Sequence, residues 1–280
     1  MLKLRVITAV VLLLLLGLAL FALPVAGWTV LVVVIVAQCA SEWSRLSGLA
    51  GRKALIYWML TLAMMLGLAW FDSQYPVEQQ AFVHLLVYAV SALLWLFIVP
   101  AWLVMGWKAA NPYLMALVGW AVLLPTGLAM MDLRVADPGP WVLIFMMGLV
   151  AAADTSAYFA GRKYGKNKLA PSISPGKTWE GVIGAMLGVS VYVLLVWGFS
   201  PLFGALSNRY ELLPIWLTAS WLWVALAVIG DLFESAVKRQ AGVKDSGALL
   251  PGHGGVLDRI DALTSTLPLA ALALLLQRLN

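Results

Sequence analysis

The sequence predicts an all-α fold, a polytopic integral membrane bundle of about nine transmembrane helices. Three observations predict this fold. The 280 residues are 63% hydrophobic, against the roughly 45–50% apolar share of soluble domains. Only 11% of the residues are charged, and the mean hydropathy is +0.94. The apolar residues also gather in runs close to the ~20 residues that a spanning helix requires.

Nine apolar runs, separated by polar residues, proline or glycine, are expected to form these helices. Only residues 24–27 divide the first two runs, so a tight helical hairpin is expected there, and eight spans stay open as an alternative. The first run also resembles a signal peptide, but it is long for one and no clear cleavage site follows, so we expect a helix. The runs cover residues 6–23, 25–40, 54–71, 81–103, 112–131, 141–160, 179–199, 214–233 and 262–278.

The positions of lysine and arginine predict the orientation, because cytoplasmic loops retain these residues. With nine helices and a cytoplasmic N-terminus, fifteen of the eighteen basic residues fall in cytoplasmic segments and three in outer ones. With eight spans, part of the chain would change sides and this excess of basic residues in cytoplasmic segments would be lost. We therefore expect a bacterial-type inner membrane protein with its C-terminus outside, and expect the charged stretches 161–178 and 234–261 on the cytoplasmic side.

One membrane domain over residues 1–280 is the simplest organisation. Residues 1–140 are expected to serve packing or dimerisation, and residues 141–280 to carry the catalytic helices and loops. The single Cys39 excludes an internal disulfide, and the presence of only His84 and His253 excludes a multi-histidine metal centre. No nucleic-acid partner is expected.

The first of two charged blocks spans residues 154–184. Its basic loop, broken by glycine and proline, indicates either an anchor on anionic lipid headgroups or a phosphate-binding loop, and the residues leave both open. A nucleotide P-loop ending at residues 176–178 is excluded, because Pro171 occupies its first glycine position and no strand is expected before it. Ser174 or Thr178 is expected to cap the next helix. The substrate-binding candidates are Asp154, Tyr158, Arg162, Lys166, Ser174, Lys177, Thr178 and Glu180.

The second block, residues 230–262, holds five of the thirteen acidic residues and four of the eighteen basic ones. Four polar residues at i, i+3, i+4 and i+7 share one face of a helix that leaves the membrane, and two aspartates three apart share a face of the next helix. In chain order these residues are Asp231, Glu234, Ser235, Lys238, Asp258 and Asp261.

Asp231, Asp258 and Asp261 together predict a Mg²⁺ site. Carboxylates presented without histidine or cysteine form the hard oxygen site that Mg²⁺ favours. Ordinary ion pairing is the alternative, with a cation of the loop folding back on an aspartate. For Glu234 and Lys238 we favour that alternative, whereas for the three aspartates we favour the metal, because a buried acid without a partner is costly.

Cations and glycines between these carboxylates predict a polyphosphate ligand. The cations are Lys238, Arg239 and Lys244; His253, between glycines, is either a structural or a functional group. The combination suits transfer between a water-soluble phosphate compound and a membrane lipid, by metal-assisted displacement at phosphorus. An ion-coupled transporter that uses Asp154 and Asp231 as carriers is the alternative from another class.

The two blocks resemble the phosphatidate cytidylyltransferases, or CDP-diacylglycerol synthases. The signature S-x-x-K-R-x-x-x-x-K-D-x-G-x-x-L-P-G-H-G-G-x-x-D-R-x-D is filled from Ser235 to Asp261. The patterns D-x-x-A-Y-F-x-G-[RK]-x-[FY]-G-[KR] and I-S-P-x-K-T-x-E-G are similar to residues 154–166 and 173–181. In the N-terminal half only Glu42-Trp43 with Arg45 is similar. Gly176 stands where many members carry a second lysine.

The resemblance implies transfer of CMP from CTP to phosphatidic acid, with Mg²⁺ and a second, monovalent cation such as K⁺, in a homodimer in the lipid bilayer. A related CTP-dependent lipid kinase stays open as an alternative. The resemblance implies Asp231 and Asp258 as metal ligands, with Asp261 close by. The implied catalytic residues are Asp231, Asp258, Asp261, Lys238, Arg239, Lys244 and His253, and further substrate contacts are Ser235, Asp245, Gly254, Gly255 and Arg259.

Overall fold

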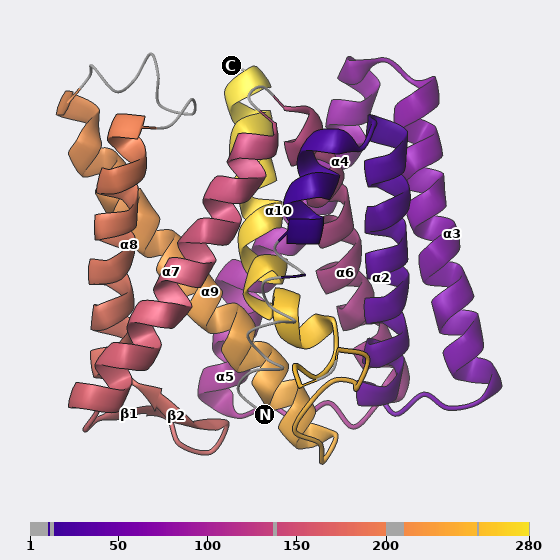
Figure 1. Cartoon of the computed structure of the whole chain (residues 1–280). Helices are drawn as coiled ribbons and strands as arrows, with labels where there is room; N and C mark the ends of the chain where they lie inside the picture. The colour runs from indigo at the N-terminus through magenta and orange to yellow at the C-terminus, as the bar shows by residue number, and fades with distance from the viewer. Residues whose placement is uncertain (1–10, 12–13, 137–138, 200–209, 251, 280) are drawn as a thin grey trace.

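The computed structural model describes residue 11 and residues 14–136, 139–199, 210–250 and 252–279. These residues form an all-α bundle with one small hairpin (Figure 1). Within the described ranges, eight helices are long and apolar enough to cross a membrane. The elements are α2 (Val25–Leu46), α3 (Arg52–Gln74), α4 (Val77–Leu93) continued by a π-helical segment (Leu94–Ile98) and α5 (Val99–Met105), α6 (Pro112–Val135), α7 (Pro140–Tyr164), β1 (Lys168–Ala170), β2 (Ser174–Thr178), α8 (Trp179–Phe199), a 3₁₀ turn (Tyr210–Leu212), α9 (Leu213–Gln240) and α10 (Leu257–Leu279).

The apolar runs predicted the helices, and the structure confirms them with longer ends. The first run, 6–23, lies partly outside the described residues, and residues 14–22 are helical. The run at 214–233 continues as α9 to Gln240, and the run at 262–278 begins as α10 at Leu257. These extra turns carry the charged residues of the second block, because a helix that leaves the membrane keeps its backbone hydrogen bonds while its side chains change from apolar to polar.

The two charged blocks lie at one end of the bundle. Figure 1 shows the β1–β2 hairpin and the loop between α9 and α10 together at the lower end, whereas the C-terminal end of α10 lies at the opposite end. This arrangement agrees with the prediction that both blocks share one side of the membrane.

A β-hairpin replaces the irregular loop that we expected after α7. β1 pairs with β2 in antiparallel register, Lys168 opposite Thr178 and Ala170 opposite Ser174. Strands this short give little period-2 signal in a sequence, so the prediction of no strand was wrong. Residues 176–178 lie inside β2, which leads directly into α8. The Thr178 hydroxyl accepts a hydrogen bond from Gly181 N at 3.1 Å, which confirms the predicted helix cap.

Glycines let the helices that carry charged residues pack closely. A Cβ atom at Gly184 of α8 would collide with Ala160 of α7, and one at Gly230 of α9 would lie 2.6 Å from the Ser265 hydroxyl of α10. Small residues at such crossings allow the close backbone approach on which helix packing in membranes depends. The crossing at Gly230 brings the adjacent Asp231 to α10.

Two buried tryptophans fix α2 against α6. The indole of Trp28 donates a hydrogen bond to Met130 O at 2.8 Å, and that of Trp43 donates to Met115 O at 2.7 Å. Both side chains are almost fully buried, at 3% and 1% exposure. Because a buried N–H without an acceptor is costly, these bonds also fix the rotation of α2. That rotation turns Glu42 inward, toward the charged end of α9 and α10.

Candidate active site

The two charged blocks meet in one cavity. Lys177 of β2 forms an ion pair with Asp231 of α9, with Nζ and Oδ2 2.6 Å apart. The cavity beside this pair has a volume of about 460 Å³ and lies between α7, β2, α8 and α9. Its charged and polar lining comes from both blocks. These residues are Asp154, Tyr158, Arg162, Ser174, Lys177, Thr178 and Asp231.

Three carboxylates lie near one another here, and two of them, Asp154 and Asp231, line this cavity. Asp154 of α7 and Asp261 of α10 both lie within electrostatic range of Asp231. Asp231 is paired with Lys177, and Oδ1 of Asp231 accepts a hydrogen bond from the Ser235 hydroxyl at 3.3 Å. Like charges at close range repel unless a cation lies between them, so this carboxylate group suits a hard divalent cation.

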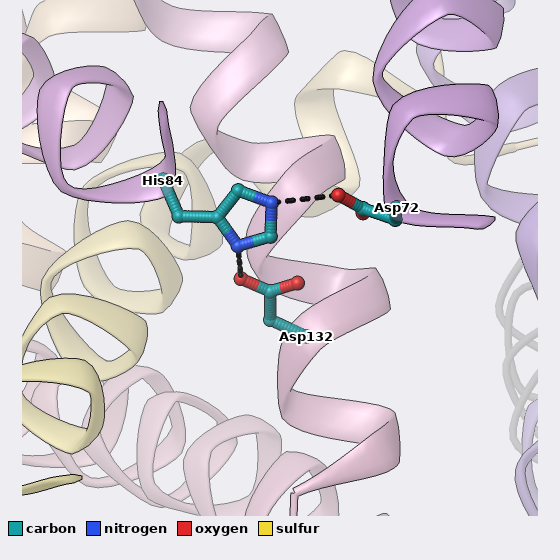
Figure 2. A group of neighbouring side chains, drawn as sticks. All are labelled: Asp72, His84 and Asp132. Carbon is teal, nitrogen blue, oxygen red and sulfur yellow. Dashed lines mark hydrogen bonds and ion pairs between the residues drawn. The ribbon is translucent and has the colours of Figure 1, made fainter. Parts of the chain in front are cut away.

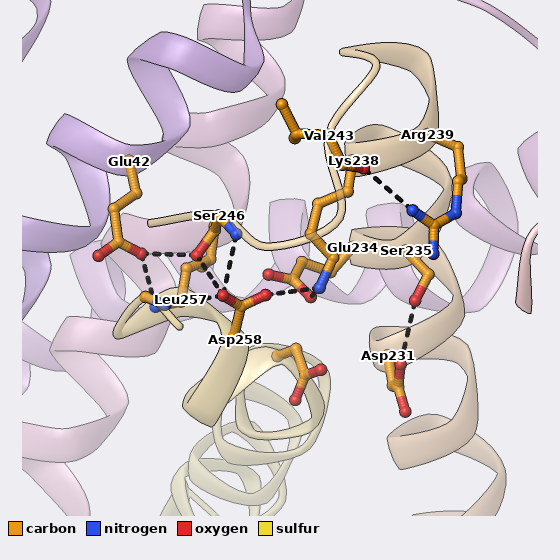
Figure 3. A network of polar contacts seen from close by, with 12 residues as sticks. Glu42, Asp231, Glu234, Ser235, Lys238, Arg239, Val243, Ser246, Leu257 and Asp258 are labelled. Carbon is orange, nitrogen blue, oxygen red and sulfur yellow. Dashed lines mark hydrogen bonds and ion pairs between the residues drawn. The ribbon is translucent and has the colours of Figure 1, made fainter. Parts of the chain in front are cut away.

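Asp258 lies in a different environment from the other aspartates (Figure 3). Its Oδ1 accepts a hydrogen bond from Lys238 Nζ at 2.6 Å, and its Oδ2 accepts bonds from Ser246 N at 2.9 Å and Gly255 N at 2.8 Å. Lys238 also contacts Glu234 Oε2 at 2.5 Å, so the predicted Glu234–Lys238 ion pair is confirmed. Asp258 thus forms an ion pair with Lys238 of α9. A metal-ligand role for Asp258 stays a prediction.

Glu42 completes this network from the N-terminal half of the chain. The side chain has 0% exposure, and its carboxylate accepts bonds from Leu257 N at 2.9 Å, Val256 N at 3.0 Å and the Ser246 hydroxyl at 2.7 Å. Its position at the N-terminus of α10 is favourable. The N–H groups there have no acceptor within the helix, and the positive end of the helix dipole faces the Glu42 carboxylate. Figure 3 shows Glu42 and Asp258 on either side of Ser246.

Sequence reasoning assigned Glu42 no role, apart from noting a weak similarity in its neighbourhood. One signal could have found it: Glu42 is the only acidic residue among the first 71 residues of an apolar chain. Its partners lie more than 200 positions away, so spacing along the sequence could not name them.

The loop between α9 and α10 lines a second, open cavity of about 620 Å³. His253 N donates to Leu250 O at 2.9 Å, and Gly254 has a φ of +84°, a left-handed conformation that favours glycine. Nδ1 of His253 is buried and has no hydrogen-bond partner among the described residues. A buried polar atom without a partner is expected to face a ligand or water. The lining residues are Lys244, Asp245, Gly247, Ala248, Leu250, Gly252, His253, Gly254 and Arg259.

The remaining candidates bond mainly to the protein itself. Arg162 donates to the Tyr158 hydroxyl at 3.1 Å one helical turn away. The Glu180 carboxylate accepts a bond from the Asn167 side chain at 2.8 Å, which closes the base of the hairpin. Arg239 is exposed and donates to Val243 O at 3.0 Å. Lys166 is exposed on the segment that leads into the hairpin.

The Glu42 network predicts a matched pair of variants. Glu42→Gln places an amide NH₂ against backbone or hydroxyl donors and leaves at least one buried donor unbonded, which costs about 1–3 kcal/mol. We expect a lower thermal unfolding temperature and reduced turnover, because the loop that holds Asp258 loosens. Glu78→Gln, at an exposed site in the first turn of α4, is the control and should change neither. Equal unfolding temperatures for the two variants would contradict this role of Glu42.

The sequence is similar to known proteins over nearly its whole length. A family model described as "Cytidylyltransferase family" matches residues 3–277. The phosphatidate cytidylyltransferase of Pseudomonas aeruginosa is 37% identical over 276 residues, which cover 97% of this chain and 96% of that protein. The protein of the same name from Haemophilus influenzae is 44% identical over 164 residues, 56% of each chain. That from Thermotoga maritima is 45% identical over 120 residues, 42% of this chain and 43% of that protein. The chain belongs to the cytidylyltransferase family.

Proposed function

We propose that the two cavities serve one reaction, the transfer of CMP from CTP to phosphatidic acid. The family and the full-length relative support this activity. The chain is a multi-pass membrane nucleotidyltransferase that makes CDP-diacylglycerol, with pyrophosphate as the other product. The observation that carries the mechanism is the Lys177–Asp231 ion pair, which joins both charged blocks at one cavity.

The cavity between α7, α8 and α9 suits the lipid phosphate. Small apolar side chains such as Ala157, Val182 and Ala185 line it together with Arg162 and Lys177. Apolar walls accept the glyceryl and acyl part of a lipid, while the two cations neutralise its phosphate. The phosphate oxygen of phosphatidic acid would then attack the α-phosphorus of CTP.

The loop cavity suits CTP. Lys244 and Arg259 line it, and the glycines at 252 and 254 let backbone groups approach phosphate or base. The buried Nδ1 of His253, which lacks a partner among the described residues, is available to hydrogen-bond the nucleotide. Lys244 and Arg259 would neutralise the charge that develops on the departing pyrophosphate.

Asp231 and Asp261 are the proposed Mg²⁺ ligands, with Asp154 beside them. The chemistry of these residues fits Mg²⁺, because all three are carboxylates with few hydrogen-bond donors nearby. A bound Mg²⁺ would stabilise negative charge on the phosphates. Asp258 would join them only if Lys238 released its Oδ1. A second, monovalent cation such as K⁺ is proposed from the family resemblance alone.

Ion pairs within the site hold the charged groups in place before the substrates arrive. Lys177 neutralises Asp231, and Lys238 neutralises Asp258. When phosphate and metal bind, Lys177 would exchange its carboxylate for phosphate oxygens, and Asp231 would exchange its ammonium for the metal. This exchange keeps the charge balanced at every stage, which matters because a lone buried charge is costly.

The proposed setting is the inner membrane, with the site facing the cytoplasm. Fifteen basic residues against three support this orientation. We place packing and dimerisation in residues 1–140 and catalysis in residues 141–280, although Glu42 reaches the site from the first part. Within one chain, α3 buries only Tyr57, Thr61 and Met65. The rest of this helix is therefore available for a homodimer interface.

Asp231→Asn tests the metal assignment. The change keeps the size of the side chain and removes its charge, and we expect turnover of CTP and phosphatidate to fall by at least about 100-fold. The unfolding temperature should fall only slightly, because Lys177 loses its partner but is 23% exposed to water, and an amide can still accept from Ser235. Mg²⁺ titration of the turnover rate is the measurement, with Glu78→Gln as the control. Full activity at the same Mg²⁺ concentration would exclude Asp231 as a ligand.

Lys177→Ala tests whether the hairpin takes part in the reaction. Loss of a charged contact to phosphate should lower kcat/KM by about 10- to 100-fold. Lys163→Ala is the matched control, because Lys163 lies in the same block but contacts the Tyr164 ring and not the cavity. Steady-state kinetics with varied phosphatidate compare the two. If both variants lose activity equally, the block acts only as a general positive surface.

A further inference from the structure

A second polar cluster lies at the opposite end of the bundle from the candidate active site. Asp72 comes from the last turn of α3, His84 from the second turn of α4 and Asp132 from the last turn of α6. The His84 ring lies between the two carboxylates (Figure 2). Its Nε2 is 2.9 Å from Asp72 Oδ1, and its Nδ1 is 2.8 Å from Asp132 Oδ2.

This geometry requires a positive charge. A neutral imidazole carries one N–H, so only one of its nitrogens can donate to a carboxylate. The other nitrogen would then present a lone pair to a carboxylate oxygen at hydrogen-bond distance. Such a contact is repulsive unless a cation, either a proton or a metal ion, lies there.

The surrounding protein supplies no such charge. Among the described residues, no lysine or arginine forms an ion pair with Asp72 or Asp132. The nearby Arg134 donates instead to Leu23 O. The side chain of His84 is 7% exposed, whereas those of Asp72 and Asp132 are 24% and 26% exposed. An ion can therefore reach the two carboxylates from water, while the imidazole is held inside.

The donor atoms are grouped as the ligands of one ion. One atom from each of the three residues lies within 4.8 Å of the other two, and first-row ions bind such ligands at about 2.0–2.2 Å. A further contact orients one carboxylate: the Tyr88 hydroxyl donates to Asp132 Oδ2 at 2.7 Å. Gln80 Nε2 donates to the backbone O of Asp72 at 2.7 Å and holds the end of α3 in place. Partners of this kind are what a metal-ligating residue needs to hold its direction.

We propose that Asp72, His84 and Asp132 form a divalent transition-metal site that ties together the outer ends of α3, α4 and α6. One imidazole and two carboxylates favour an ion such as Zn²⁺ over Mg²⁺, because imidazole is a borderline ligand that Mg²⁺ seldom takes. The three helices belong to the N-terminal half, so the ion would brace the bundle and take no part in the chemistry at the other end. The proposal does not depend on the proposed function.

Titration of purified, chelator-treated protein with Co²⁺ tests this site, because Co²⁺ absorbs visible light when bound by nitrogen and oxygen ligands and stands in for Zn²⁺. With excess Mg²⁺ present to fill the carboxylate site at the other end of the bundle, we expect one Co²⁺ per chain with a histidine-dependent spectrum, displaced by Zn²⁺. His84→Gln should weaken Co²⁺ binding by at least about tenfold. His253→Gln, which removes the only other histidine of the chain, is the matched control and should leave the Co²⁺ spectrum unchanged.

Asp72→Asn gives an independent test, because the Asp72 side chain is 24% exposed and its change disturbs packing less than a change at the buried His84. It should also weaken Co²⁺ binding, while the unfolding temperature without metal stays close to that of the wild type. If the wild type gives no Co²⁺ spectrum, or if Asp72→Asn binds Co²⁺ as the wild type does, the proposal is wrong and the charge at His84 is a proton.

Discussion

The buried carboxylate of Asp258 is the constraint on which the charged end of this protein depends. Lys238, Ser246 and Gly255 all bond to it, so α9, the loop after it and the start of α10 share one anchor. Glu42 bonds to the same Ser246 from α2. Two buried carboxylates with a full set of donors fix a loop that is otherwise rich in glycine, and a loop fixed in this way can hold a nucleotide.

The apolar helices explain why the charged groups meet where they do. Tryptophan bonds set the rotation of α2 against α6, and glycine crossings bring α7, α8, α9 and α10 together. Charged side chains are costly inside a bilayer, so they gather where the helices leave it. The cavity between α7, β2, α8 and α9 lies beside those helix ends, and the loop after α9 lines the second cavity. In the proposed reaction, the lipid would reach this site from the membrane and the nucleotide from the surrounding water.

Much of this arrangement could be predicted from the sequence, because helical periodicity and charge act locally. The shared face of Asp231, Glu234, Ser235 and Lys238 follows from their spacing, and the structure bears it out. Contacts between distant segments could not be predicted. The β1–β2 hairpin, the Lys177–Asp231 pair and the role of Glu42 depend on tertiary packing, and the histidine cluster joins three helices whose order alone does not reveal their contacts.

The fate of each phosphate of CTP tests the central claim most directly. Purified protein would be incubated with phosphatidate, Mg²⁺ and CTP labelled with ³²P at either the α or the γ position. The account predicts that the α label enters the lipid and that the γ label leaves as pyrophosphate. Transfer of the γ label to the lipid, with CDP as the second product, would contradict it and identify a lipid kinase.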